Sequence, residues 1–578
     1  MTERTAPADG AASGPAPVGP VMAGAPGPAP ASRPASGIRW AIALLVVAVV
    51  VGIAAAGAYL LGGTVPSRVL GYVPPGTVAY LELRLDLPGD QREQLGRFLS
   101  RFPGFDDTAL LERKLAEVYD RIVRAATNDR HDYSSEIEPW FGGEVAVAVG
   151  GLPDVPDATP LKALLLVSVT DGAAASAWVD RLVGDAPTSG ETHNGVELTL
   201  IGQPGQTRAA AAVTGGVLLI GDADAVRASI DTGGRSSFAT TEGVTAGRAG
   251  LGGDRLGMVY VDLKSVVDWA TSVGSELSPG AETLGRSMLD RVPSWVTFGI
   301  GASDGTMVGT VLAPHVDAPG LTNASSALLE RIPASALLVV DQHEVGKIVL
   351  DALDSVRALP AAADAMRQVD EAAGLLGGLD RLLGWIGEVA VVVDSDGSSV
   401  SGGVLVRASD PIAMAGLLAA ARGFIALGGA SALTVREESH AGTTITIVDV
   451  PAGLAPGRDA APTSAGFSVA YANTGDMLIV GASDGFVRRI LDTTPEDSLV
   501  RRERFTRLLD QAGPKHTSLV WLDLTAVRGS LEESLVDPAA KSRYERDLRS
   551  YLEPLDAFIG ATVVGDDLDR FNSILTVR

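Results

Sequence analysis

The hydrophobic positions of the chain follow two different patterns. Residues 41–61 form one apolar run, AIALLVVAVVVGIAAAGAYLL, with no charged side chain. A helix of this length extends roughly 30 Å, which is the thickness of the hydrocarbon core of a bilayer. The run predicts a transmembrane helix over residues 39–62, with the membrane as its partner over residues 40–61. Beyond residue 65 the apolar residues recur in short stretches instead, as in a folded globular region.

The globular region reads as short β-branched strands with helices between them. Strands are predicted over residues 78–83, 144–149, 163–169, 196–201 and 210–220. A helix is predicted over 173–183. The strands 296–300 and 307–312 are predicted to form a hairpin through Ser303-Asp304-Gly305. Short turns between neighbouring strands favour antiparallel sheet, with mixed pairing as the alternative, so the predicted class is α+β.

The order of these elements is repeated once along the chain. The segment WFGGEVAV from Trp140 recurs as WIGEVAV from Trp385, and six such pairs of segments keep the same order. The repetition predicts two tandem duplicated α+β domains with mainly antiparallel, or mixed, sheets, at 65–315 and 322–578. The segment between them contains Pro319-Gly320 and is predicted to be a short joint.

The N-terminal tail precedes the apolar run. Residues 1–38 are dominated by Pro, Ala and Gly and contain too little large apolar side-chain area to fold, so we expect disorder. Arg33 and Arg39 lie before the run, and the first charge after it is Arg68. The positive-inside rule then puts the tail in the cytoplasm and the globular region outside the plasma membrane. A cleaved signal peptide is the alternative, which the length of the run disfavours.

The net charge and the cysteine content restrict the classes of partner and of chemical site. The formal net charge is −24, and the acidic excess lies in the globular region, which would repel nucleic acid. The chain contains no cysteine, so disulfides, thiolate metal ligands and cysteine nucleophiles are excluded.

One serine has a sequence context that resembles a hydrolase nucleophile. The motif Gly-x-Ser-x-Gly surrounds Ser483, between a predicted strand and a predicted helix. The duplicate segment has Ala223 in place of this serine, and the other occurrence of the motif, around Ser303, falls in a predicted hairpin turn. Asp224 and Asp484, which both copies keep, are predicted to cap the following helices. We therefore assign no catalytic residue and keep a hydrolase that uses Ser483 as the alternative.

The sequence patterns that resemble metal-binding motifs are weak evidence as well. Asp394-Ser-Asp396-Gly opens like a calcium loop but lacks the later acidic ligands, so a hairpin turn is the better interpretation. Asp262 and Asp523 end strands and precede helices, which predicts helix caps. No metal-binding or cofactor-binding residue is assigned. The spacing of the histidines is not typical of metal ligands; they are His131, His193, His315, His343, His440 and His516.

Several segments at the start of the globular region are typical of one bacterial family. They are YVPPGTVAYLE from Tyr72, Leu85-Asp86 with Gly89-Asp-Gln91, Phe102-Pro-Gly104 and EPWFGGEVAV from Glu138. On these motifs, residues 68–578 resemble the uncharacterised membrane-anchored family catalogued as domain of unknown function thirty-three fifty-two. The resemblance implies one N-terminal membrane helix and a large outer region. It implies no activity, ligand or catalytic residue.

The sequence therefore predicts a single-pass membrane protein with an acidic extracytoplasmic region and a non-catalytic binding or scaffold role in the cell envelope. A protein partner or an apolar ligand is expected between the two repeats. The alternative function is that of an extracytoplasmic hydrolase that uses Ser483.

Overall fold

A computed structural model describes the chain from residue 67 onward, except for residues 106–110, 151, 153–161, 204–208, 253, 278–291, 318–320, 358, 360–361, 375–376, 396–398, 425–432 and 452–466. The predicted tail, 1–38, and the predicted transmembrane helix, 39–62, lie outside the described residues. Among the residues that are described, no helix is long and apolar enough to cross a membrane.

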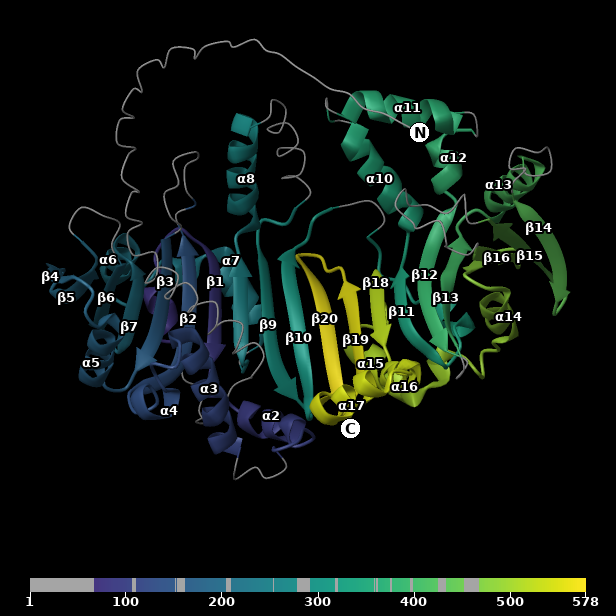
Figure 1. Cartoon of the computed structure of the whole chain (residues 1–578). Coiled ribbons are helices and arrows are strands. Elements are labelled where there is room, and N and C mark those ends of the chain that lie inside the picture. Colours follow the sequence, from purple (N-terminus) through teal and green to yellow (C-terminus); the bar gives the residue numbers. More distant parts are fainter. Residues whose placement is uncertain are drawn as a thin grey trace, which may run out of the picture.

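In the described part of the chain, twenty strands form one continuous sheet, and every pairing between them is antiparallel. In Figure 1 the strands cross the molecule from β4 to β14, with β10 and β20 side by side in the middle. From the middle outward, the first half contributes β10 (Thr306–Pro314), β9 (Val296–Ser303), β8 (Gly257–Val261), β1 (Thr77–Arg84), β2 (Phe141–Gly150), β3 (Lys162–Val169), β7 (Val217–Asp222), β6 (Ala209–Thr214), β5 (Val196–Ile201) and β4 (Thr188–His193). In the same direction, the second half contributes β20 (Leu568–Val577), β19 (Leu555–Val563), β18 (Ser518–Leu522), β11 (Ala336–Gln342), β12 (Ile386–Ser395), β13 (Val400–Ala408), β17 (Met477–Gly481), β16 (Phe467–Asn473), β15 (Thr443–Val450) and β14 (Thr434–His440).

The two halves have the same strand order and meet edge to edge. Strand β10 pairs with β20 over eight positions, from Met307 opposite Leu575 to Pro314 opposite Leu568. The predicted fold class, a transmembrane helix followed by two tandem α+β domains with separate sheets, is therefore wrong, because the described chain builds one large antiparallel sheet. The physical reason is that the last strand of each half has an edge of unpaired N–H and C=O groups, and each edge satisfies the other.

Helices connect the strands at corresponding places in the two halves. In the first half they are α2 (Gln91–Leu99), α3 (Leu111–Thr127), α4 (Tyr133–Glu136), α5 (Gly172–Val183), α6 (Ala223–Asp231), α7 (Glu242–Leu251) and α8 (Leu263–Leu277). In the second half they are α10 (Val345–Arg357), α11 (Ala363–Gly374), α12 (Leu379–Leu383), α13 (Pro411–Phe424), α14 (Asp484–Asp492), α15 (Glu503–Ala512), α16 (Leu524–Ser534), α17 (Pro538–Asp547) and α18 (Arg549–Leu552). Helices α6 and α7 cover one face of the first half, and α14 and α15 cover the corresponding face of the second.

Both faces of strands β2 and β3 are buried. Successive side chains of a strand point to opposite faces. Ala146 and Leu164 therefore belong to the core beneath α6 and α7, whereas Val147 and Leu165 belong to a second core on the other face. That second core includes Trp178 of α5. Burial on both faces explains why these strands are almost continuously apolar in sequence.

Glycines decide two local details of the sheet. The predicted hairpin at residues 303–305 is confirmed, because β9 and β10 join through Asp304 and Gly305, whose φ angles of 51° and 70° suit a tight two-residue turn. The single strand predicted over 210–220 is wrong, since Gly215 and Gly216, with φ of 54° and 79°, make a second such turn between β6 and β7.

Candidate functional site

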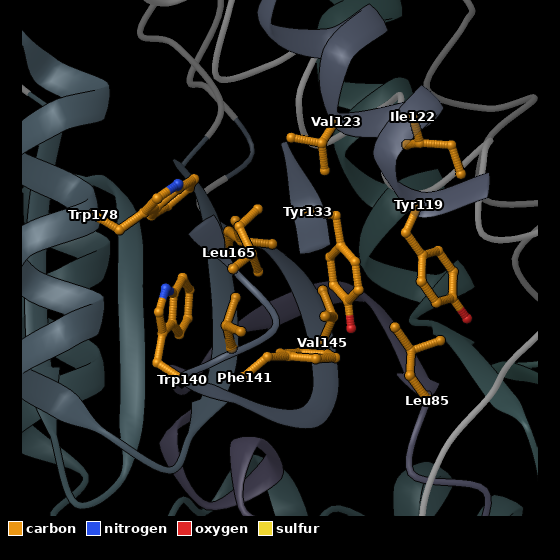
Figure 2. A pocket seen from close by; sticks show the side chains of 12 residues that line it. Leu85, Tyr119, Ile122, Val123, Tyr133, Trp140, Phe141, Val145, Leu165 and Trp178 are labelled. Carbon is orange, nitrogen blue, oxygen red and sulfur yellow. The ribbon is translucent and has the colours of Figure 1, made fainter. Parts of the chain in front are cut away.

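An apolar cavity lies in the first half, between the sheet and the helices α3, α4 and α5. Its volume is about 90 Å³. Strands β2 and β3 form its floor on the face opposite α6 and α7. Figure 2 shows the lining side chains converging from these elements. The twelve lining residues are all aliphatic or aromatic: Leu85, Tyr119, Ile122, Val123, Tyr133, Ile137, Trp140, Phe141, Val145, Leu165, Val167 and Trp178.

Five of the twelve lining residues are aromatic, and their rings contact one another in two groups. The ring centroids of Tyr119 and Tyr133 are 5.0 Å apart in an edge-to-face arrangement, and those of Tyr133 and Phe141 are 6.1 Å apart. On the opposite side of the cavity, the rings of Trp140 and Trp178 are 5.5 Å apart (Figure 2). These distances are typical of favourable aromatic pairs, so the wall is held in a fixed shape.

One polar group in the wall has no partner. The indole N–H of Trp140 donates to the carbonyl oxygen of Glu136 at 2.6 Å. By contrast, the indole N–H of Trp178 is buried and has no hydrogen-bond acceptor within the described residues. Burial also raises the pKa of the Tyr133 hydroxyl. An unpaired donor buried in apolar surroundings costs about 1–3 kcal/mol of folding free energy.

The corresponding face of the second half is open. Val391 corresponds to Val147 in the duplicated segments, and it is 42% exposed, whereas Val147 is 7% exposed. The helices between the first two strands of each half account for the difference. In the first half α3 and α4 lie against the cavity, whereas in Figure 1 α10, α11 and α12 stand beyond the ends of β11 and β12. The two halves thus share the same sheet but differ in the helices that cover this face.

Two larger hollows are less suitable as binding sites for an apolar molecule. One, of about 310 Å³, lies beside the loop 74–77 and includes Lys162 and Asp224 in its wall. The other, of about 240 Å³, lies in the second half and includes Arg331 and Arg407. Both mix charged and apolar side chains. The apolar cavity is therefore the better candidate for an apolar ligand, although it lies within the first half and not between the repeats.

Comparison with known proteins decides the family. A family model described as "Protein of unknown function (DUF3352)" matches residues 40–570, which is most of the chain. The chain belongs to the DUF3352 family. A search of curated proteins gave no match. Two solved structures, described as crystal forms I and III of TP0453, are similar at 10% and 9% identity over 43% of this chain and 79% and 80% of theirs, but the TM-score of 0.20 for each carries no argument.

In this DUF3352 protein, Ser483 is a helix cap. Its hydroxyl oxygen accepts a hydrogen bond from the N–H of Phe486 at 3.2 Å, at the start of α14. The only histidine that follows it in sequence, His516, is fully buried, and its ring lies beside Asp341. Across the described residues, no histidine is hydrogen-bonded to Ser483. A serine without a base is not an activated nucleophile, so the arrangement favours a structural role.

The caps of the two corresponding helices differ from the prediction. Asp222, and not Asp224, caps α6, accepting two hydrogen bonds from first-turn N–H groups at 3.0 and 3.3 Å. Asp224 forms an ion pair with Arg227 at 2.9 Å, and Asp484 pairs with Arg488 at 3.3 Å. A carboxylate in the first turn is favourable beside the helix N-terminus whether or not it caps, so the sequence did not distinguish the two positions.

Other acidic residues of the DUF3352 chain behave as the sequence suggested. Asp394 lies in the predicted hairpin and is fully buried. Its carboxylate accepts hydrogen bonds from Ser335 at 2.6 Å and Arg489 at 2.7 Å. Asp396 of the same motif lies outside the described residues. The predicted caps Asp262 and Asp523 are confirmed, because each accepts a hydrogen bond from an N–H in the next helix, at 2.9 and 3.0 Å.

Folding also brings together two histidines that the sequence separates widely. The pairing of β11 with β18 places the rings of His343 and His516 with centroids 5.4 Å apart, next to Asp341. Within the described part of the chain, these three side chains are the group that could hold a metal ion. Their spacing along the sequence gave no signal, because the ligands come from two strands. A residue-by-residue alignment of the two duplicated halves is the sequence signal that could have found these residues.

Proposed function

We propose that this protein binds a slender apolar chain of the acyl type in the cavity of its first half, without catalysing a reaction. The observation that carries the proposal is the lining of that cavity, which consists of twelve aliphatic and aromatic side chains. The hydrocarbon end of an acyl chain would bury its methylene groups against these side chains.

The size of the cavity restricts the ligand. A volume of about 90 Å³ is well below the roughly 300–1,000 Å³ of sites for drug-sized molecules. A slender chain can place one end there, whereas a fused ring system would not fit without moving α3 or α4. The ligand class is therefore a single hydrocarbon chain and not a bulky polycyclic molecule.

The N-terminal sequence supports a position at the cell envelope. The apolar run over residues 40–61 is long enough to contact a bilayer, and Arg33 and Arg39 on its N-terminal side favour a cytoplasmic tail. We therefore include in the proposal that the chain is held at the plasma membrane with its folded part outside. At that position the protein would be close to a supply of acyl chains.

Binding of a fluorescent acyl probe tests the proposal. The full chain is titrated with cis-parinaric acid, a slender conjugated carboxylic acid, and saturable binding of one molecule per chain is expected. Val123→Phe adds volume to the cavity wall on α3 and is expected to weaken binding at least 10-fold. The matched control is Val349→Phe on α10, where the valine is 37% exposed. Equal affinity in the two variants would contradict the proposed site.

A further inference from the structure

The second half contains an enclosed cluster of one carboxylate and two imidazoles. Asp341 lies on β11, His343 directly after it, and His516 shortly before β18. Their exposed fractions are 0%, 6% and 0%. Main-chain pairing fixes their positions, because the N–H of His343 donates to the carbonyl oxygen of Thr517 at 2.9 Å. Two neighbouring strands thus bring three side chains that can ligate a metal to one buried point.

The hydrogen bonds of His516 fix its tautomer. Its Nδ1 lies 3.0 Å from the carbonyl oxygen of Gly513, which can only accept, so Nδ1 carries the proton. In the neutral ring, Nε2 then carries a lone pair and is an acceptor. It lies 3.4 Å from Oδ2 of Asp341, which is also an acceptor. Two acceptors in this position repel unless a proton or a metal ion lies between them. A ring nitrogen that donates to a backbone carbonyl, with the other directed at a ligand site, is the usual arrangement of a metal-bound histidine.

Two more polar atoms of the cluster are buried without a partner in the part of the chain that is described. They are Oδ1 of Asp341 and Nε2 of His343, and this Nε2 lies 3.8 Å from Oδ2 of the same carboxylate. A proton on His516 would leave both atoms unsatisfied. A metal ion among the three side chains would be ligated by both imidazoles and by the carboxylate, which gives the unpaired Nε2 of His343 a partner.

The first half carries arginines where the second half carries these histidines. The alignment of β1 with β11, and of β8 with β18, relates the two clusters. Among the arginines of the first cluster, Arg248 donates to the buried carboxylate of Glu82 at 3.1 Å, so positive charge is built into the protein there. The second half keeps the carboxylate, and among its described residues no guanidinium forms an ion pair with Asp341. The corresponding pairs are Glu82 with Asp341, Arg84 with His343, and Arg255 with His516.

A second carboxylate adds to the negative charge of the second cluster. Glu388 corresponds to Glu144 of the first half, and it is 6% exposed. It accepts hydrogen bonds from the N–H groups of Ala327 and Leu328 at 3.3 and 3.2 Å, as Glu144 does from the equivalent segment. Arg407, at 4.0 Å, is half exposed. The cluster is therefore short of positive charge within a buried site.

We propose that Asp341, His343 and His516 bind one divalent transition-metal ion, with Zn²⁺ as the closest match. Two imidazoles and a carboxylate are a ligand set that zinc accepts, with bonds of about 2.0–2.2 Å. A tetrahedral ion with such bonds needs ligand atoms about 3.3 Å apart. The atoms here lie 3.4 and 3.8 Å apart for two pairs, and all lie within 4.8 Å of one another, so small side-chain rotations complete the site.

Zinc binding to the full chain tests this site. The purified chain is stripped with a chelator and titrated with Zn²⁺ against a chromophoric competitor, and one ion per chain is expected. His343→Gln and His516→Gln are each expected to weaken binding by at least about 100-fold. The matched control is His440→Gln, because His440 also pairs with a carboxylate, that of Asp492 at 2.7 Å, but at the surface of the same half. Its affinity for zinc should equal that of the unmodified chain.

X-ray absorption of the zinc-loaded, unmodified chain keeps the test decisive if the buried variants fail to fold. Two imidazole ligands in the first coordination shell are expected. The proposal is overturned if the unmodified chain takes up no stoichiometric zinc, if the His343→Gln chain binds it as tightly as the His440→Gln chain, or if the bound ion has fewer than two imidazole ligands. In the first case, a protonated His516 paired with Asp341 would be the remaining explanation of the cluster.

Discussion

At the scale of single residues, unpaired buried polar atoms are the most informative feature of this protein. Most buried polar groups in proteins are hydrogen-bonded, so each exception needs a cause. Two tryptophans in the cavity wall differ in whether the indole N–H has an acceptor. Trp140 directs its N–H to a backbone carbonyl, whereas the N–H of Trp178 meets no acceptor in the described residues. Both residues are tryptophans and their rings contact each other. The difference therefore arises from the surroundings of each N–H and not from the residue type.

The indole of Trp178 predicts an equal effect of Trp178→Phe on two kinds of probe. This change makes the ring in the cavity wall smaller and removes an N–H that is buried behind the apolar lining. Affinity for an acyl probe that carries a carboxylate and affinity for a hydrocarbon probe of similar length should therefore fall by the same factor. Fluorescence titrations with the two probes measure both values. A loss confined to the carboxylate probe would show that the N–H binds the ligand's oxygen and would contradict insertion of the hydrocarbon end.

Ser483 gives a second prediction at this scale. Because its hydroxyl caps α14, Ser483→Ala should lower the free energy of unfolding by about 1 kcal/mol. Urea denaturation followed by circular dichroism measures the change. Asp484→Ala is the control, since its carboxylate forms a half-exposed ion pair and its loss should cost less than the cap. Labelling of Ser483 by a fluorophosphonate in the folded chain would contradict the structural role.

At the scale of elements, local pattern was sufficient for most strands and helices and insufficient for their contacts. The helix predicted over 173–183 is α5, which begins one residue earlier, and the strand predicted over 196–201 is β5. These elements have a clear period or a clear boundary in sequence. Strand β4 was missed because its side chains are mostly polar and exposed. A strand that buries neither face has no hydrophobic period to detect.

The candidate sites were less accessible to sequence reasoning than the elements. The cavity forms only when α3 and α4 pack on β2 and β3. The sequence of a helix does not show which face of a sheet it will cover. Trp140 and Phe141 were visible as aromatics in a repeated motif, but their partner Trp178 comes from a helix more than thirty positions later. The histidine cluster depends on strand register in the same way. Long-range pairing is the information that the sequence pattern lacks.

At the scale of the whole molecule, duplication produced one sheet with two different halves. The pairing of β10 with β20 makes the joint continuous, and the histidine that follows β10 reinforces it. Nδ1 of His315 lies 2.9 Å from Oδ1 of Asp569 on β20. The halves have diverged around this joint, since the first contains an apolar cavity and the second contains the buried histidine cluster. An edge-to-edge joint tolerates such changes because most of its bonds are between backbone groups.

The joint should have a measurable dependence on pH. The hydrogen bond to Asp569, with Asp317 also nearby, raises the pKa of His315 above its ordinary value. The folded state therefore binds the proton more tightly than the unfolded state, so the stabilisation is complete below about pH 6.5 and disappears as pH rises through the folded-state pKa. The difference in urea midpoint between the unmodified chain and His315→Gln should be larger at about pH 5.5 than at about pH 8.5. A difference that does not change with pH would show that this ion pair contributes nothing.

The most direct test of acyl binding is to map where a photoreactive acyl chain attaches to the full-length protein. A fatty acid with a diazirine near its terminal methyl group is bound, activated by light, and located by peptide mass spectrometry. We predict labels on the cavity-lining segments of α3, β2 and β3, and their loss in the Val123→Phe chain but not in the Val349→Phe chain. Labels on the open face around Val391, or labels unaffected by Val123→Phe, would contradict acyl binding in the cavity.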